Sequence, residues 1–472
     1  MRPNWCGCDG HGNEASRKPL EKPARPATTE AYAGAKFTRR QALMGAALAS
    51  VGWMARSATA LADVAIMPGQ QETQGDVLVV VFMRGGADGL SMVVPYAEDA
   101  YHRHRQTLGV AAPNDRRARA NNRALDLDGF FGLHPALAPL RPLYGEGLLG
   151  FAHAVGSGDH TRSHFEAMSA MERGLATEST GTGSGWLARH LDNSPRNNAS
   201  PLRAVAFSNV MPDSLRGATD ATALNSLADF RLSLPNTSEA THIPGSRANR
   251  VEAMHHTLTQ LYEDGQDAVA HAGRETLAVL DALNKLDPTH YRPANGAVYP
   301  NSELGTGLRQ VACLLKGHVG LEIACLDHRG PYLWDTHVAQ NNILPAQLED
   351  IGKSLAAFAG DMGKDMKGVT VVVMTEFGRR LQENTGLGTD HGRASVMMLM
   401  GQGVIGGKVL ARWPGLEDHQ LEGPGDLRVT MDYRDVLAEV LTRRVNTDYS
   451  HNGRLAAVFP NYQPHFPGVT KT

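Results

Sequence analysis

The sequence predicts an α/β fold in which a mostly parallel central sheet carries helices on both faces. Two segments, Asp76–Met83 (DVLVVVFM) and Val369–Met374 (VTVVVM), are almost continuously apolar and rich in β-branched residues. Strands that are buried on both faces, as in parallel sheets, have this composition, whereas half-exposed strands alternate apolar and polar residues. Segments with apolar residues at helical spacing separate such strands along the chain, which is typical of α/β folds.

The remaining elements are predicted from the same two patterns, continuous apolar runs for strands and apolar residues at helical spacing for helices. Further strands are predicted at 147–155, 203–207, 319–326 and 396–400, and helices at 134–144, 165–171, 186–191, 345–362 and 433–443. Residues 209–300 contain loops rich in Pro, Asn and Ser around one long helical pattern, 248–286. We therefore expect a single domain over 76–465, in which about 209–300 form a largely helical elaboration outside the sheet.

The N-terminal 62 residues resemble an export signal. Residues 1–37 are polar and without period, which predicts disorder. Arg39 and Arg40 precede a weakly apolar run, 42–55, and Ala60-Leu61-Ala62 provides a small-residue cleavage site. This combination resembles a twin-arginine signal peptide; a basic amphipathic helix is the alternative. We expect a disordered n-region plus signal over 1–62, a linker over 63–75, a twin-arginine translocation partner, and a periplasmic or exported protein.

Composition restricts the classes of function. A net charge of −3 and a pI near 6.7 give no electrostatic reason to bind nucleic acid or an anionic membrane. The run 42–55 is too short for a stable membrane span. The chain has 20 His but only 4 Cys, which suits an imidazole and carboxylate metal site better than a thiolate site. Whether Cys313 and Cys325 pair is left open by their spacing.

Polar residues follow the predicted strands at several points where each strand ends. They are Asp88, the segment from His160 to His164, Asp335 with His337, Glu376, and Asp390 with His391. In open α/β sheets, binding sites form at the carboxyl ends of the strands. Because carboxylates and imidazoles are good ligands for divalent metals, the sequence predicts a metal site at this edge.

The junction between the strand 147–155 and the following helix carries two hydroxyl side chains and an arginine. Thr161, Arg162 and Ser163 lie where a helix N-terminus favours a bound anion. The alternative is that Asp159, Thr161 or Ser163 only caps the helix. The sequence leaves both interpretations open.

Several motifs resemble known families. FMRGGADGLSMVVPY, RSHFEAM, WDTHVAQ, TEFGRR, GTDHG and DYRDVLAEVL, within residues 77–443, resemble DUF1501, an uncharacterised family of exported bacterial proteins. The order of the strand-end residues resembles the alkaline phosphatase and sulfatase superfamily. That resemblance implies an alkaline-phosphatase-like core.

The superfamily resemblance also implies a two-metal site. The first metal would take Asp335, His337 and His391, with Asp390 as a further candidate ligand. The second would take Asp88, Glu376 and a nucleophile, for which Thr161 is the first choice and Ser163 the second. The chain departs from the pattern at Phe377, which follows Glu376 where the superfamily usually has a histidine ligand.

Two functions remain from these observations. The first is an exported hydrolase of small phosphate or sulfate esters that uses a divalent metal, Zn, Ca, Mg or Mn, with Arg162 or Arg379 clamping the anion. Arg379 could equally pair with Glu383 at the surface. The second is a non-catalytic periplasmic binding or assembly protein that retains the fold.

The export signal generates a prediction of its own. Replacing Arg39 and Arg40 with lysine should trap the precursor in the cytoplasm, because the twin-arginine pathway reads the arginine pair. Cell fractionation checks this outcome, and unchanged export of the double variant would contradict it.

Overall fold

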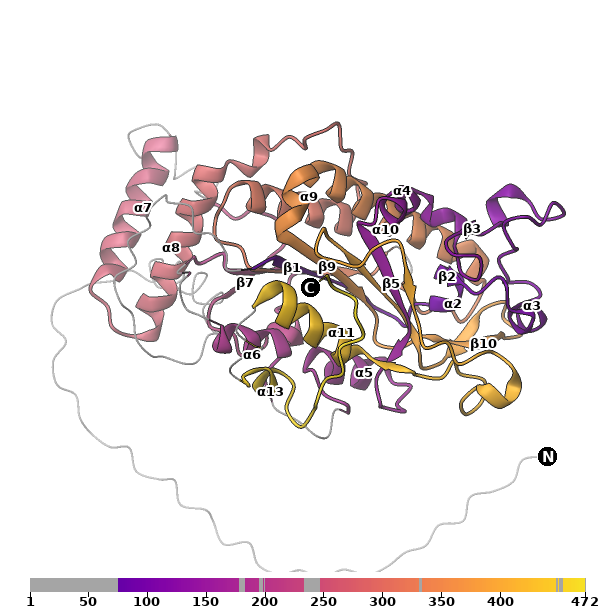
Figure 1. Ribbon diagram of the computed structural model, residues 1–472. Helices are drawn as coiled ribbons and strands as arrows, with labels where there is room; N and C mark the ends of the chain where they lie inside the picture. The colour runs from indigo at the N-terminus through magenta and orange to yellow at the C-terminus, as the bar shows by residue number, and fades with distance from the viewer. Residues whose placement is uncertain are drawn as a thin grey trace, which may run out of the picture. The chain divides into compact units, whose positions relative to one another are not determined.

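The computed structural model describes residues 75–471 apart from 178–182, 195–197, 199, 233–246, 331–332, 447–448 and 450–452. The predicted signal peptide, 1–62, lies outside the described residues, as does the linker up to residue 74. Both therefore stay predictions, as do the boundaries proposed for the domain. Figure 1 labels the helices and several of the strands named below.

A nine-stranded sheet forms the centre of the described chain. Its strands are β1 (Val77–Met83), β5 (Leu149–Gly156), β6 (Ala204–Phe207), β7 (Ala221–Leu224), β8 (Ile323–His328), β9 (Val369–Met374), β12 (Ser395–Met400), β13 (Val409–Leu410) and β14 (Met431–Asp432). The order across the sheet is β13-β5-β12-β9-β1-β8-β6-β7, and β14 also pairs with β5. The two segments from which the sheet was predicted, β1 and β9, lie next to each other at its middle.

The pairing is parallel except at one strand. β12 runs antiparallel to both of its neighbours, β5 and β9, and every other pair in the sheet is parallel. This confirms the predicted fold class. It also means that β1, β5, β8 and β9 all end at the same edge, so the residues that follow them are brought together.

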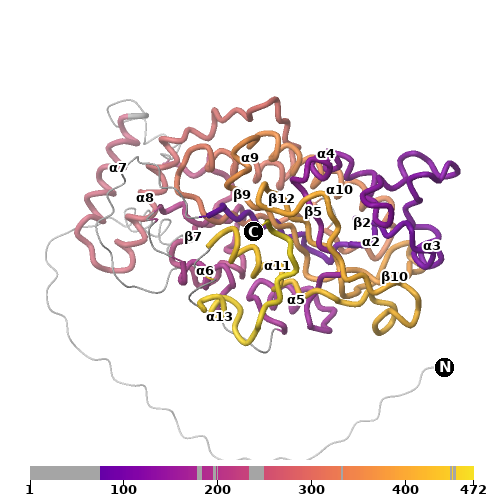
Figure 2. Tube along the Cα trace, in the orientation of Figure 1, coloured from indigo at the N-terminus to yellow at the C-terminus, as the bar shows by residue number. Residues whose placement is uncertain are grey.

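Helices cover both faces of the sheet (Figure 1). Successive residues of β1 point alternately to two hydrophobic cores: Val79 and Val81 to one, Val80 and Phe82 to the other. The first core is closed by α8 (Ala268–Leu286), α9 (Glu303–Lys316) and α10 (Gln340–Met362), and the second by α5 (His164–Glu172), α6 (Trp186–Asn193), α11 (Tyr433–Val440) and α13 (Leu455–Val458). Figure 2 shows that α6 and α11, far apart in the sequence, lie on the same side of the sheet.

The long helical pattern at 248–286 was predicted as one element and forms two. They are α7 (Arg247–Glu263) and α8, separated by a turn in which the side chain of Asp267 caps α8 by accepting from the amide of Ala270, 2.8 Å away. Gly265 lies in the same turn, where a Cβ would meet the side chain of Ala270. The region 209–300 also supplies β7, which extends the sheet, so this part of the chain is not wholly an elaboration.

The remaining α-helices and strands of the described residues are short. They are α2 (Gly89–Met92), β2 (Val93–Val94), α3 (Asp99–His104), β3 (Leu125–Asp126), β4 (Gly132–Leu133), α4 (Arg141–Gly145), β10 (Arg379–Glu383) and β11 (Thr389–His391). Strands β2, β4 and β3 form a small sheet, and β10 pairs with β11 in an antiparallel hairpin that follows β9.

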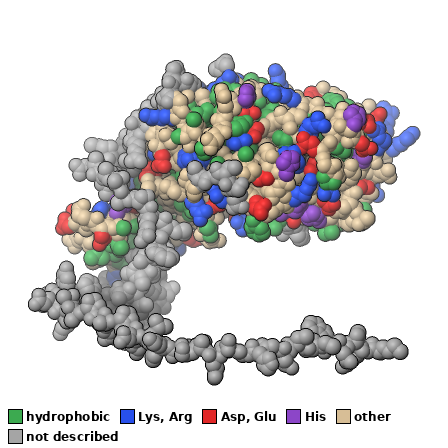
Figure 3. All heavy atoms as spheres, turned by 90° about the horizontal axis from the view of Figure 1, so that it is seen from below, with side chains coloured by type: hydrophobic (Ala, Val, Ile, Leu, Met, Phe, Trp, Pro, Cys, Tyr) green, Lys and Arg blue, Asp and Glu red, His purple; other side chains and the backbone are tan. Residues whose placement is uncertain are grey.

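Two further expectations concern the surface and the thiols. Among the helices that the structure describes, none is long and apolar enough to cross a membrane. On the face shown in Figure 3, acidic and basic side chains are intermixed, with histidines among them. Cys313 and Cys325 are both buried and both free, which answers the question of their pairing.

Candidate metal centre

Two segments at the carboxyl edge of the sheet, together with the hairpin after β9, place one cluster of side chains. His164 is the first residue of α5, which follows β5. Asp335 and His337 lie in the loop between β8 and α10. His391 ends β11, where it pairs with Arg379 of β10 in the hairpin. The parallel sheet thus explains why residues far apart in the sequence meet here.

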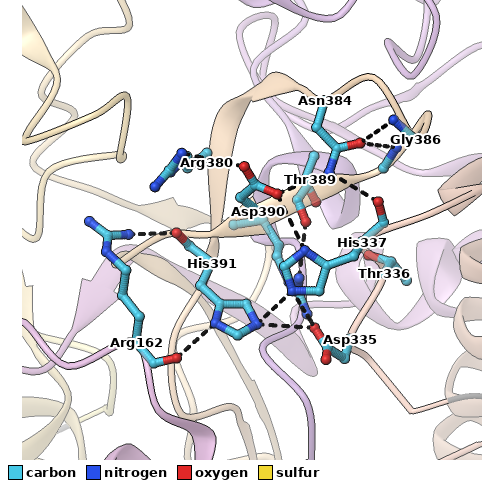
Figure 4. A network of polar contacts seen from close by, with 12 residues as sticks. Arg162, Asp335, Thr336, His337, Arg380, Asn384, Gly386, Thr389, Asp390 and His391 are labelled. Carbon is cyan, nitrogen blue, oxygen red and sulfur yellow. Dashed lines mark hydrogen bonds and ion pairs between the residues drawn. The ribbon is translucent and has the colours of Figure 1, made fainter. Parts of the chain in front are cut away.

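The ligand atoms of His337, His391 and Asp335 face one another (Figure 4). Nε2 of His391 lies 3.0 Å from Nε2 of His164 and 2.8 Å from Nε2 of His337. Asp335 Oδ1 is 3.1 Å from Nε2 of both His337 and His391. His164, Asp335 and His391 form a group whose ligand atoms all lie within 4.8 Å of one another, and Nε2 of His337 adjoins it.

The second nitrogen of each ring faces a hydrogen-bond acceptor. His164 Nδ1 lies 2.7 Å from Glu376 Oε1, and His391 Nδ1 lies 2.7 Å from the backbone carbonyl of Arg162. His337 Nδ1 lies 3.3 Å from Asp390 Oδ1. Ionised carboxylates and carbonyls only accept, so each Nδ1 carries the proton and donates it. In the neutral rings, all three Nε2 atoms then present lone pairs to the cluster.

This donor set fits a divalent metal. Three lone pairs and a carboxylate at these distances repel one another unless a positive charge lies among them. Metal-binding histidines typically donate their other ring N–H to a carboxylate or carbonyl, which fixes the tautomer and orients the ring. Each of the three rings has such a partner. The residues present therefore meet both requirements of an imidazole and carboxylate metal site.

Electrostatics favour a positive charge at this point. Burial lowers the pKa of His164, but hydrogen bonds with Asp335 and Glu376 outweigh that effect and raise it to about 9. Burial raises the pKa of Asp335, but hydrogen bonds with His164, His391 and Arg379 hold it well below its ordinary range. Without a metal, the cluster thus holds a proton on His164.

Glu376 and Asp390, which were predicted as metal ligands, contact the outer ring nitrogens of His164 and His337. Glu376 is buried and accepts from the amide of Gly85, 2.9 Å away, as well as from His164. Asp390 accepts from Asn384 Nδ2 at 3.0 Å and from His337. Both carboxylates orient imidazoles of the cluster. The ring of Phe377 packs against His164 and His391, with centroids 4.8 and 5.0 Å apart.

Asp88, also predicted as a ligand, is held elsewhere. Its side chain is fully buried, and its two oxygens accept from Arg105 at 2.6 and 3.0 Å. Ser91 and Gln340 donate to the same carboxylate at 2.7 and 2.6 Å. Its oxygens are thus engaged by a bidentate guanidinium, and among the described residues Asp88 is not part of the group formed by His164, Asp335 and His391.

The two predicted anion clamps are engaged within the protein. The guanidinium of Arg379 is fully buried and donates to the carbonyls of Gly85, Gly86 and Thr389 and, at 2.5 Å, to Asp335 Oδ1. It positions the cluster rather than facing a substrate. Arg162 donates to Asp426 Oδ2 and to the carbonyl of His391, both at 2.6 Å, although a third of its side chain is exposed.

The predicted nucleophiles have local partners. The hydroxyl of Ser163 accepts from the amide of Glu166, as the N-cap of α5. Thr161 Oγ1 donates to Glu166 Oε2 at 2.5 Å and accepts from the amide of Ser163. Of the two interpretations left open, the structure thus favours helix capping.

His164 is the member of the cluster whose role the sequence did not assign. The sequence placed a segment from His160 to His164 at the sheet edge without saying which ring points inward. The available signal was its position directly after a capping residue, because the first residue of a helix at this junction has its backbone fixed by the cap.

The fold and the cluster together define an α/β protein with a candidate His and Asp metal centre. The chain belongs to the DUF1501 family, described as a protein family of unknown function, whose model matches residues 148–456. This confirms the predicted family. No curated protein matches the chain.

Solved structures add a distant likeness. Two structures of TAB5 alkaline phosphatase, mutants in which one histidine is replaced by glutamate or aspartate and Mg is bound in the M3 site, are each 10% identical to the chain. Each alignment covers 70% of this chain and 91% of the other, at a TM-score of 0.26. A likeness at that score supports no conclusion about the fold family or the chemistry of this chain.

The proton on His164 generates a prediction. Since a metal binds only the neutral imidazole, metal binding at pH 7 should release about one proton, and apparent affinity should rise roughly ten-fold per pH unit until pH approaches 9. Calorimetry in buffers of different ionisation enthalpy measures the released proton. The Glu376→Gln variant is the control, since losing that carboxylate should lower the pKa of His164 and flatten the profile. Affinity independent of pH in the wild type would contradict the prediction.

Proposed function

We propose that this chain is an exported, metal-dependent hydrolase of phosphate or sulfate esters with a single metal centre. The observation that carries the proposal is the convergence of three imidazole Nε2 atoms on the carboxylate of Asp335, with an acceptor on the far nitrogen of every ring. Export rests on Arg39 and Arg40 and remains a proposal from the sequence.

The donor set favours one class of cation. Ca²⁺ and Mg²⁺ prefer sites made of oxygens, whereas imidazole nitrogen suits Zn²⁺ and other transition ions. Three nitrogens and a carboxylate therefore favour Zn²⁺ among the metals considered from the sequence. When bound, such a cation supplies a Lewis acid that neutralises ester oxygens and lowers the pKa of water.

The charges around the centre favour an anionic substrate. Asp335 and Glu376 carry two negative charges and Arg379 one positive charge. With a divalent cation present, one positive charge is left over, and it is shielded from water on the side of Glu376 and Arg379, which are both buried. An anion is attracted to such a charge, whereas a neutral ester gains little.

The approach of a substrate is limited to one side. His164 and His391 have 19% of their side chains exposed and pack against the buried ring of Phe377. His337 and Asp335 are 41% and 34% exposed. The exposed side therefore receives the ester, while Glu376, Asp390 and the carbonyl of Arg162 keep the imidazoles in place.

The attacking group in this proposal is water rather than a protein hydroxyl. Thr161 and Ser163 are already engaged by Glu166 and by the end of α5. The same observation supports a second candidate function, a binding or assembly protein that retains one structural metal, because such a protein needs no nucleophile. Turnover decides between the two.

The test is turnover by the zinc-loaded protein on aryl phosphate monoesters, aryl phosphate diesters and aryl sulfates. We expect hydrolysis of at least one class, and we expect it to survive in Thr161→Ala and Ser163→Ala, with Ser163→Ala losing about 1 kcal/mol of stability with its cap. Ser163→Asp, which keeps a cap, is the matched control for that loss.

Two results would count against this account. Absence of turnover on the whole panel would favour the binding protein. Loss of turnover in Thr161→Ala at unchanged metal content would restore a protein nucleophile in place of water.

A further inference from the structure

A pocket of about 280 Å³ opens at the same sheet edge as the metal centre. Its walls come from the ends of β1, β6 and β8 and from α5, and include Arg84, Met168, Val210, Met211, Cys325 and Arg329. Its volume is close to the lower end of the ~300–1,000 Å³ of small-molecule sites. That volume suits a small organic group better than a large cofactor.

The pocket and the metal centre share structural supports. Met168 follows His164 by four residues on α5, so both side chains lie on one face of the helix. Arg84 donates to the sulfur of Met168 at 3.4 Å. The next residue, Gly85, donates its amide to Glu376, the carboxylate that orients His164. Met168 in the pocket wall and His164 in the cluster are therefore about one turn apart on the same helix.

Apolar surface is exposed around both. Val210, in the pocket wall, is 64% exposed, and Phe165, next to His164, is 84% exposed. Val338, which follows His337, is 60% exposed.

The charges of the pocket argue against a second anionic group in the ligand. Arg84 forms ion pairs with Glu172 at 3.1 Å and with Asp327 at 2.8 Å. Arg329 lies 3.3 Å from Asp327, and Asp213 adds a further carboxylate to the wall. Three acids thus face two arginines. The excess carboxylate in the wall would repel a carboxylated ligand group, whereas an uncharged group is not repelled.

We propose that this pocket binds the uncharged organic part of the ester, an aryl or short alkyl group, while the anionic head lies at the metal centre. The site then prefers esters whose organic part is apolar. Esters of methanol and esters with an acidic organic part bind less tightly. This inference rests on the proposed function for the position of the head, but the pocket itself needs no metal.

The first experiment tests the pocket alone, with 1-naphthol as the probe and its fluorescence anisotropy as the signal. The wild-type chain should bind naphthol with or without zinc. Val210→Asp should weaken binding at least about ten-fold, the effect of spoiling an apolar subsite. Val298→Asp is the matched control, because Val298 is 82% exposed and lies outside the pocket. No naphthol binding, or equal binding by Val210→Asp, would overturn the proposal.

The second experiment places the head, using non-hydrolysable phosphonates on the zinc-loaded protein and calorimetry. Naphthylphosphonate should bind at least about ten-fold more tightly than methylphosphonate, and Val210→Asp should remove that preference while methylphosphonate affinity and zinc content stay unchanged. Equal affinities in the wild type would overturn the pairing of pocket and centre. Naphthol binding without any phosphonate binding would support the pocket and contradict the proposed function.

Discussion

Three imidazole nitrogens and one carboxylate, brought from distant parts of the chain, face one another at about hydrogen-bond distance. His391 Nε2 lies within 3.1 Å of Asp335 and of both other rings. Because every Nδ1 donates outward, the inward lone pairs repel unless a proton or a cation lies among them. The loops after β5, β8 and β9 bring these groups together around a place for a proton or a cation. The proposed function rests on a divalent cation at that place.

Two buried arginines hold those loops without taking part in the cluster. Arg379 joins the end of β1, the carbonyl of Trp334 and the carboxylate of Asp335. Arg105 binds Asp88 and the backbone carbonyls of Arg380 and Leu381 at the start of the hairpin that carries His391. Removing one partner of the fully buried Arg105–Asp88 pair costs about 3–5 kcal/mol. The position of the hairpin that carries His391 is therefore coupled to the stability of the fold.

The sequence predicted the sheet and part of the cluster because both depend on local patterns. Apolar runs mark β1 and β9, and positions after strand ends place Asp335, His337 and His391 at one edge of the sheet, where the superfamily resemblance grouped them as one metal site. The partners of buried charges are not local. Asp88 pairs with Arg105 from a segment without periodicity, and Glu383 accepts from the amides of Thr107 and Leu108 instead of pairing with Arg379. Sequence alone therefore identified the acids but not what neutralises them.

The central claim is that these four side chains hold one divalent metal, and elemental analysis of the purified mature chain tests it most directly. After zinc loading and removal of free metal, the wild type should retain about one equivalent. His391→Ala should retain little, because its nitrogen adjoins the other three ligands, while His290→Ala, at an 83% exposed side chain, should match the wild type. A metal-free wild type, or a full equivalent in His391→Ala, would contradict the account.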